Sequence, residues 1–238
     1  QYQQAEEPLV KWAEMEPDNP EAYRLLGWVH YHQQHYAQAA EQFTRAGRLA
    51  STNDDIFWGL GNSLSRLGEF EQALIAFERC AELKPNSAVV HDAQAWTLYH
   101  LGRYEEAITV FSRALELEET ASSYHGLGAS YDNLGEWEQA LAAFQKWVEL
   151  DPGNDTSYSS MAWALNKLKR YEEAVTAFSE ALKLSETASS YQGLGLSYDN
   201  LGEWEEALAA FQKWAELDPD NGTAYSSMAW ALYRLKRY

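Results

Sequence analysis

Histidine is the first residue type in this chain that could do chemistry, because six are present and three of them lie close together. His30, His32 and His35 stand in the run His-Tyr-His-Gln-Gln-His, which would suit a transition metal if the rings converged. On a helix, residues at i, i+2 and i+5 point in different directions. The run is therefore interpreted as an ordinary polar surface, and no metal site is expected.

The other candidates for catalysis are isolated or explained by helix structure. Cys80 is the sole cysteine, so neither an intrachain disulfide nor a CxxC metal pair can form. Glutamate pairs such as Glu105-Glu106, Glu172-Glu173 and Glu205-Glu206 fall where helices are expected to begin, and negative charge there complements the helix dipole. The sequence contains no Ser-His-Asp order, phosphate-binding loop or HExxH motif. We expect no enzyme activity and no cofactor.

Two segments have the sequence of a glycosylation site, Asn154-Asp155-Thr156 and Asn221-Gly222-Thr223. Both are expected on exposed loops. An Asn that follows a loop proline is also ordinary helix-capping chemistry, and capping is the favoured interpretation of Asn154 and Asn221.

The elements that must position these residues repeat along the chain at steps of 33 or 34 residues. An alanine marks each unit, with Leu9 or a phenylalanine four residues later: Ala5, Ala39, Ala73, Ala107, Ala140, Ala174 and Ala207. Upstream of the alanine, most units carry an aromatic residue or His, then a bulky and a small residue, at the spacing of one helix face. Glycine often separates the two segments, and proline often closes the unit. Each unit is predicted to be a pair of helices.

This pattern resembles the tetratricopeptide repeat family, with an aromatic residue, then Leu-Gly, then Ala, Phe, Ala and Pro at that family's offsets over essentially the whole chain. The resemblance implies an all-α, right-handed superhelical solenoid of helix-turn-helix repeats that forms a single domain over residues 1–238. A half repeat with only the second helix is expected at 1–19, and one with only the first helix at 222–238. The full repeats are expected at 20–53, 54–87, 88–120, 121–154, 155–187 and 188–221.

A longer period of two repeats is superimposed on the short one. Residues 119–171 match residues 186–238 at 44 of 53 positions. One tryptophan series follows the same alternation in the first helices: Trp28, Trp96, Trp163 and Trp230. A second series stands where the family usually keeps alanine, and these residues are expected to pack in the core: Trp12, Trp147 and Trp214.

In the family, the side of the first helices that is not used by the core lines a concave groove. The residues that this resemblance places there are Trp28, Tyr31, Trp58, Asn62, Trp96, Tyr99, His125, Asp132, Asn133, Trp163, Asn166, Gln192, Asp199, Asn200, Trp230 and Tyr233. Aromatic rings beside amides suit a groove that holds an extended peptide. The alternative is that the tryptophans only pack against neighbouring helices. One subtype of the family binds a partner's terminal carboxylate through Lys and Asn, and that clamp is not present here.

The charge balance limits the class of partner. The chain has 36 acidic and 18 basic residues, a formal net charge of −18, which repels nucleic acid and anionic membrane surfaces. Basic or neutral proteins are the expected partners. No apolar run approaches the roughly 18 residues of a membrane span. Cysteine usage does not fix the compartment, so cytoplasmic and secreted locations both agree with the sequence.

The sequence thus predicts a non-catalytic scaffold that binds peptide or protein segments. The first alternative is a structural subunit that joins head to tail, since the chain opens with a second helix and closes with a first helix. Leu9, Trp12 and Leu232 are the residues expected at such a contact. The second alternative is the targeting arm of an enzyme whose catalytic part lies outside this chain.

Overall fold

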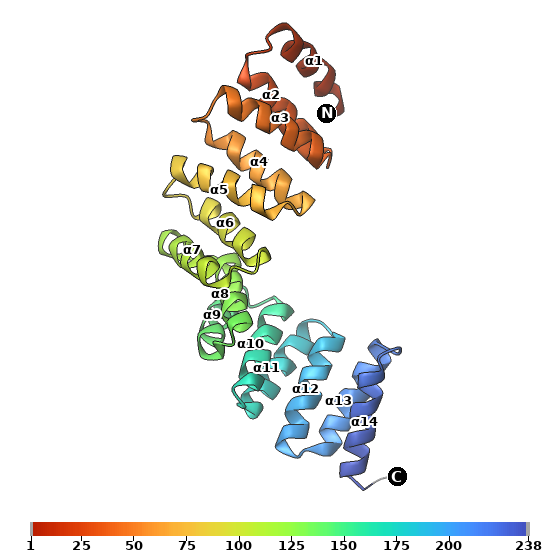
Figure 1. The fold of residues 1–238 in the computed structure, drawn as a ribbon. Helices are drawn as coiled ribbons and strands as arrows, with labels where there is room; N and C mark the ends of the chain where they lie inside the picture. Colours follow the sequence, from red (N-terminus) through yellow and green to blue (C-terminus); the bar gives the residue numbers. More distant parts are fainter. Residues whose placement is uncertain (1, 237–238) are drawn as a thin grey trace. The chain divides into compact units, whose positions relative to one another are not determined.

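A computed structural model describes residues 2–236 of the chain. Those residues form fourteen helices and no strand (Figure 1). The helices are α1 (Tyr2–Met15), α2 (Pro20–His32), α3 (Tyr36–Leu49), α4 (Asp54–Leu67), α5 (Phe70–Leu83), α6 (Ala88–His100), α7 (Tyr104–Leu117), α8 (Ala121–Leu134), α9 (Trp137–Leu150), α10 (Asp155–Lys167), α11 (Tyr171–Leu184), α12 (Ala188–Leu201), α13 (Trp204–Leu217) and α14 (Gly222–Arg234). Residue 1 of the first expected half repeat and residues 237–238 of the last lie outside the described part.

The helices are arranged as a solenoid of helix pairs, which confirms the predicted fold class. Two compact units divide the chain, one of residues 1–119 with α1 to α7 and one of residues 120–238 with α8 to α14. Within each unit every helix packs against the one before and the one after it in the chain. Two pairs of first helices also touch, α2 with α4 and α10 with α12. Each unit is described by itself below.

The turns between paired helices confirm the role expected of glycine. The helices that precede these turns end on a residue in the left-handed region at Gly68, Gly135 and Gly202, with φ of 79°, 76° and 81°. A residue with a side chain adopts the same conformation at Gln34 and Lys169, at φ of 64° and 60°. Glycine has no Cβ to clash there, so these two positions carry a local strain that glycine avoids.

Phenylalanine rings of the second helices lie in the core, and several of them leave room only for glycine opposite. Phe43 of α3 is fully buried, and a Cβ added to Gly27 of α2 or Gly59 of α4 would lie within 2.8 Å and 2.3 Å of its ring. Phe178 of α11 meets Gly193 of α12 in the same way, at 2.0 Å. The backbone of the next repeat therefore lies directly on the ring. Burial of such a side chain stabilises the fold by about 1.5–3 kcal/mol.

The second tryptophan series packs as predicted in the carboxyl-terminal unit. Trp147 of α9 and Trp214 of α13 are buried in the cores around Phe144 and Phe211. Trp12 of α1 is half-buried and packs against the cluster that contains Phe43.

Candidate functional site

Four of the five tryptophans expected to face a groove lie half-buried, with each ring against a core phenylalanine of its own repeat, whereas Trp230 is exposed. The centroid distances are 5.1 Å for Trp28 and Phe43, 5.6 Å for Trp58 and Phe77, 5.4 Å for Trp96 and Phe111, and 5.4 Å for Trp163 and Phe178. Each of these four rings packs inward and keeps part of its surface accessible, so the packing is confirmed and contact with a partner stays a prediction. Together with the amides and phenols at neighbouring positions they are called the first-helix face here.

In the amino-terminal unit, part of this face is used to join one first helix to the next. Asp55 at the start of α4 accepts hydrogen bonds from the Arg24 guanidinium and, at 2.8 Å, from the Trp28 indole Nε1, both on α2. The Arg24 guanidinium also pairs with Glu21, and these two carboxylates raise its pKa. A single carboxylate thus holds a cation and an indole from the neighbouring repeat.

Aromatic contacts surround two predicted tyrosines in the same unit. Tyr31 lies 5.5 Å from Tyr36, and Tyr99 lies 5.5 Å from Tyr104, both edge to face. Each contact joins the end of a first helix to the start of its second helix. These two tyrosines are half-buried.

A hollow of about 250 Å³ lies between α4, α5 and α6 and brings predicted residues together. Asn62 and Trp96 line it, with Ser65, Phe70 and His100 beside them. The His100 imidazole is stacked on the Phe70 ring at 4.8 Å. The Ser65 hydroxyl is buried and, within the described part of the chain, has no hydrogen-bond partner. A buried hydroxyl without a partner is energetically costly.

Ser65 and Phe70 were not among the predicted site residues. The register contained a signal for Ser65, because it holds the twelfth position of its first helix, where Tyr31, Tyr99 and Asn166 stand in other repeats. Phe70 begins a second helix, and only the packing of α5 against α6 brings it to the face.

In the carboxyl-terminal unit, several predicted residues bind their own unit. Asn166 of α10 donates to the Gly193 carbonyl of α12 at 3.3 Å and accepts from the Ser197 hydroxyl at 2.8 Å. Asn133 and Asn200 donate to carbonyls one turn earlier in their own helices. Asn166 therefore joins two first helices, as Asp55 does in the other unit.

His125 and Asp132 are two titratable residues of the face, and the environment of each shifts its pKa. The His125 ring is stacked on the buried Trp147 ring at 4.1 Å, and burial lowers the pKa of His125. Burial raises the pKa of the Asp132 carboxyl, and Lys167 opposes that effect. Gln192 and Asp199 are half-buried on α12.

The last helix presents the most exposed aromatic residues of the face. Trp230 and Tyr233 are 48% and 55% exposed, and their rings stack with centroids 5.8 Å apart. The Arg234 guanidinium lies over the Trp204 ring at 4.6 Å. The residues expected at an end-to-end contact lie deeper, because Leu9 and Trp12 pack against the Phe43 cluster and Leu232 packs against the Phe211 cluster.

The histidine run differs in one respect from its sequence interpretation. His32 is exposed and stacks on Tyr2 at 4.6 Å, and His35 precedes α3, as expected of a polar surface. His30 is only 7% exposed, so the interpretation was wrong for this residue. Its ring occupies the eleventh position of α2, which faces the core. Among residues 2–236, no group of three or more His, Cys, Asp or Glu side chains is placed to hold a metal ion.

Both sequon asparagines cap helices. Asn154 and Asn221 accept from the backbone N–H two residues onward at 3.0 Å, and their amide nitrogens donate to Asp151 and Asp218. Glycosylation of these asparagines stays a prediction. The glutamate pairs lie in the first turns of α7, α11 and α13, where the helix dipole favours them.

Stacked helix pairs with aromatic and amide side chains on one face define a solenoid repeat protein, a class built for extended contact surfaces. In the described range, none of the helices has both the length and the apolar character to cross a membrane. A family model described as anaphase-promoting complex, cyclosome, subunit 3 matches residues 1–80 and 100–181. Two models described as tetratricopeptide repeat match residues 55–119 and 188–221.

The chain belongs to the tetratricopeptide repeat family, whose members generally mediate protein–protein interaction. The model of subunit 3 by itself matches more than half of the chain. The chain is 32% identical over 90 residues to the Hsp70-Hsp90 organizing protein of Triticum aestivum, an alignment that covers 37% of this chain and 16% of that protein. The chain spans less than a third of the length of the first curated relatives that it matches.

Solved structures share the fold at low identity. The C-terminal part of a TPR repeat-containing protein from Cytophaga hutchinsonii matches with a TM-score of 0.79 and 18% identity, over 95% of this chain and 94% of that one. YrrB, described as a TPR protein with an unusual peptide-binding site, matches with a TM-score of 0.70 and 24% identity, over 79% of this chain and 98% of that one. At these identities the likeness shows the fold alone.

Proposed function

We propose that this chain is a non-catalytic scaffold that binds an extended peptide segment of a partner protein along its first-helix face. The half-buried tryptophans support this proposal, because rings that are already held by a core phenylalanine offer contact area at a low entropic cost. The Asn62 amide lines the same hollow as the Trp96 ring.

The hollow between α4, α5 and α6 carries the proposal. Its volume of about 250 Å³ suits one side chain of a partner, and its walls combine the Trp96 and Phe70 rings with the Ser65 hydroxyl. An extended peptide supplies both N–H donors and carbonyl acceptors, so it can satisfy the hydroxyl while its side chain contacts the rings. Arg66, at the rim, is exposed and can bind a carbonyl or a carboxylate.

Selection from a displayed library of unstructured peptides, followed by measurement of Kd with the whole chain, tests this function. Trp96→Phe shortens the ring while it keeps an aromatic side chain against Phe111, and Arg66→Gln removes the rim charge. We expect Kd to rise up to about tenfold in each variant. Arg113→Gln on α7 and Trp214→Phe on α13 are matched controls outside the hollow. Unchanged Kd in both hollow variants, with helicity preserved, would refute the proposal.

Self-assembly and attachment to an enzyme outside this chain remain predictions. A charge at Leu9 or Leu232 is expected to dissolve head-to-tail polymers, which analytical ultracentrifugation would detect. Both leucines also pack within their own units, so thermal unfolding must accompany the measurement.

A further inference from the structure

A series of hollows lies on the other side of the first helices, between consecutive second helices. The floor of each hollow is formed by the fourth, seventh and eleventh residues of the first helix that lies between the two second helices. In the hollow around Phe57 the eleventh residue is Leu64, and Ala76 lies on the following second helix. In the hollow around Tyr158 the corresponding residues are Leu165 and Ala177. These two floors are apolar.

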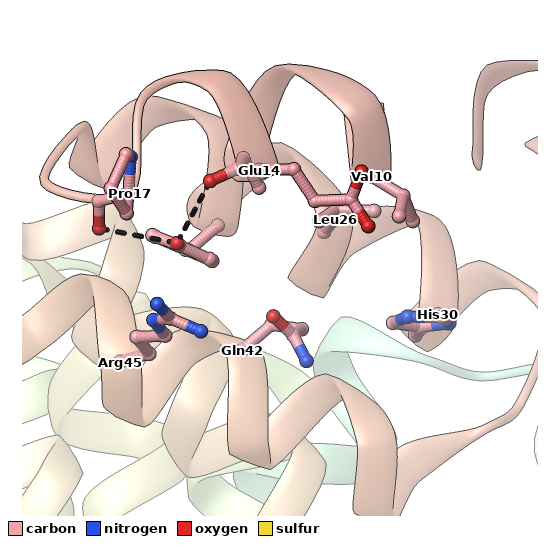
Figure 2. A pocket seen from close by; sticks show the side chains of 9 residues that line it. Val10, Glu14, Pro17, Leu26, His30, Gln42 and Arg45 are labelled. Carbon is pink, nitrogen blue, oxygen red and sulfur yellow. Dashed lines mark hydrogen bonds between the residues drawn. The ribbon is translucent and has the colours of Figure 1, made fainter. Parts of the chain in front are cut away.

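The hollow of about 290 Å³ between α1, α2 and α3 departs from this pattern (Figure 2). His30 stands where the other hollows have Leu64 and Leu165, and Gln42 stands where they have Ala76 and Ala177. The other full repeats carry Leu or Tyr at the position of His30 and Ala or Val at the position of Gln42. Hydrogen-bonding side chains at both positions are therefore confined to the repeat at 20–53.

Some polar groups of this hollow have interaction partners within the chain, and one does not. The Tyr23 hydroxyl donates to the carbonyls of Ala13 and Pro17 at 3.2 Å and 3.1 Å. The Arg45 guanidinium lies 4.2 Å from the centre of the Tyr23 ring, a cation–π contact. The His30 ring is more than nine-tenths buried, and among the described residues its Nδ1 has no hydrogen-bond partner. This nitrogen calls for a partner from outside the chain.

Two charged side chains line the hollow, Glu14 of α1 and Arg45 of α3. Figure 2 shows Glu14 of α1 across the opening from Gln42 and Arg45 of α3, with His30 at one end. Within the described part of the chain Glu14 forms no ion pair. An adjoining depression shares Val10 and Glu14 and adds Glu6, Glu7 and Lys11, so the outer side of α1 is acidic overall. The α1 side of the opening therefore favours a cationic partner, while the Arg45 guanidinium is held over the Tyr23 ring on the other side.

We propose that this hollow is a second binding site, for a short extended segment of a partner in which an apolar residue is flanked by Lys or Arg. The apolar side chain packs on Val10 and Leu26, a backbone amide pairs with Gln42 and with His30 Nδ1, and a flanking cation pairs with Glu14. The site lies on a different surface from the first-helix face and does not depend on the function proposed for it.

Nuclear magnetic resonance of the His30 imidazole in the whole chain tests this site directly. The ligand is the capped peptide acetyl-Gly-Lys-Leu-Lys-Gly-amide, and acetyl-Gly-Glu-Leu-Glu-Gly-amide is its charge-reversed counterpart. We expect the basic peptide to shift the His30 resonances in a saturable manner and the acidic peptide to leave them unchanged. Absence of a shift with the basic peptide at millimolar concentration would overturn the proposal.

Three variants separate the contributions. His30→Leu and Gln42→Ala copy the residues of the equivalent hollows, so the fold is expected to tolerate them. Each should weaken binding of the basic peptide about three- to tenfold, as expected for loss of one buried hydrogen bond. Glu14→Gln should weaken it about two- to fivefold, because the carboxylate is exposed.

Two further outcomes decide the location of the site. Arg113→Gln on α7 should leave binding of the basic peptide unchanged, because Arg113 lies outside this hollow and outside the hollow between α4, α5 and α6. Binding that survives both His30→Leu and Gln42→Ala, in chains with wild-type circular dichroism, would show that the peptide binds elsewhere and that the hollow is not its site.

Discussion

The two units join their first helices with different chemistry. In residues 1–119, α2 meets α4 through the Asp55 carboxylate, which holds the Arg24 guanidinium and the Trp28 indole. In residues 120–238, α10 meets α12 through the neutral Asn166 amide, which holds a hydroxyl and a carbonyl. The helix pairs beneath both contacts are packed alike. The joint between repeats is therefore free to vary while the core stays the same.

This difference affects what each unit responds to. A contact between a carboxylate and a guanidinium weakens as salt screens it, whereas an amide contact does not. The first-helix face of the amino-terminal unit should therefore loosen at high ionic strength, and that of the carboxyl-terminal unit should keep its geometry.

The largest expected effect concerns the packing that both units share. Gly193→Ala and Gly59→Ala each place a methyl group in collision with the ring of a buried phenylalanine, 2.0 Å and 2.3 Å from its nearest carbon. We expect each substitution to lower the free energy of unfolding by about 1–3 kcal/mol through overpacking. Denaturant unfolding followed by circular dichroism would measure this loss.

Gly153→Ala is the matched control for both, because no atom lies within 4 Å of its added Cβ. Its free energy of unfolding should stay close to that of the wild type. If Gly193→Ala were as stable as Gly153→Ala, the ring would have to be mobile, and the shared packing described above would be wrong.

Asp55→Asn breaks the charged joint while it keeps the side-chain shape. Arg24 loses its partner on α4, and we expect the amino-terminal unit to lose about 1.5 kcal/mol at low salt, as for a hydrogen bond to a charged group. At 1 M salt the difference from the wild type should shrink. A loss that is independent of salt would show that the contact acts through shape rather than charge.

Asn166→Ala breaks the neutral joint. Ser197 keeps its bond to the Gly193 carbonyl at 2.8 Å, so we expect a smaller loss of about 1 kcal/mol from the missing amide bonds. The loss should be equal at low and high salt, in contrast to Asp55→Asn. Unfolding curves of the two variants at two salt concentrations would compare the joints directly.

The smallest effect is a pH dependence of the carboxyl-terminal unit. Burial lowers the pKa of His125 below its ordinary value of 6.5, so the unfolded chain takes up a proton at this residue more readily than the folded chain. Stability from the neutral ring is complete above pH 6.5 and is lost as the pH falls from there through the lower pKa of the folded state. His125→Phe keeps a ring against Trp147 and should remove this part of the acid sensitivity. Thermal unfolding between pH 7.5 and 5 would show it.

The repeat pattern predicted the fold because its signals are local. Alanine, phenylalanine and glycine at fixed spacing determine which side of each helix is buried, and the left-handed turns at Gly68, Gly135 and Gly202 follow from the same spacing. The sites were less predictable. The Asp55 joint depends on how α2 crosses α4, two elements away, and the register of a single repeat does not contain that information. The registers of Ser65 and His30 do indicate where these residues lie, but the lack of a hydrogen-bond partner for their polar atoms depends on the neighbouring helices.

The contact of Phe43 with Gly59, and of Phe178 with Gly193, has a consequence for how such a chain can grow. Glycine stands at this register in alternate repeats, at Gly59, Gly126 and Gly193, whereas Ala93 and Ser160 stand between them. Loss of the repeat at 54–87, for example, would place Ala93 over Phe43, whose ring leaves no room for a Cβ at this register. Lengthening in steps of two repeats preserves every ring and its gap, which accounts for a duplication that copies pairs.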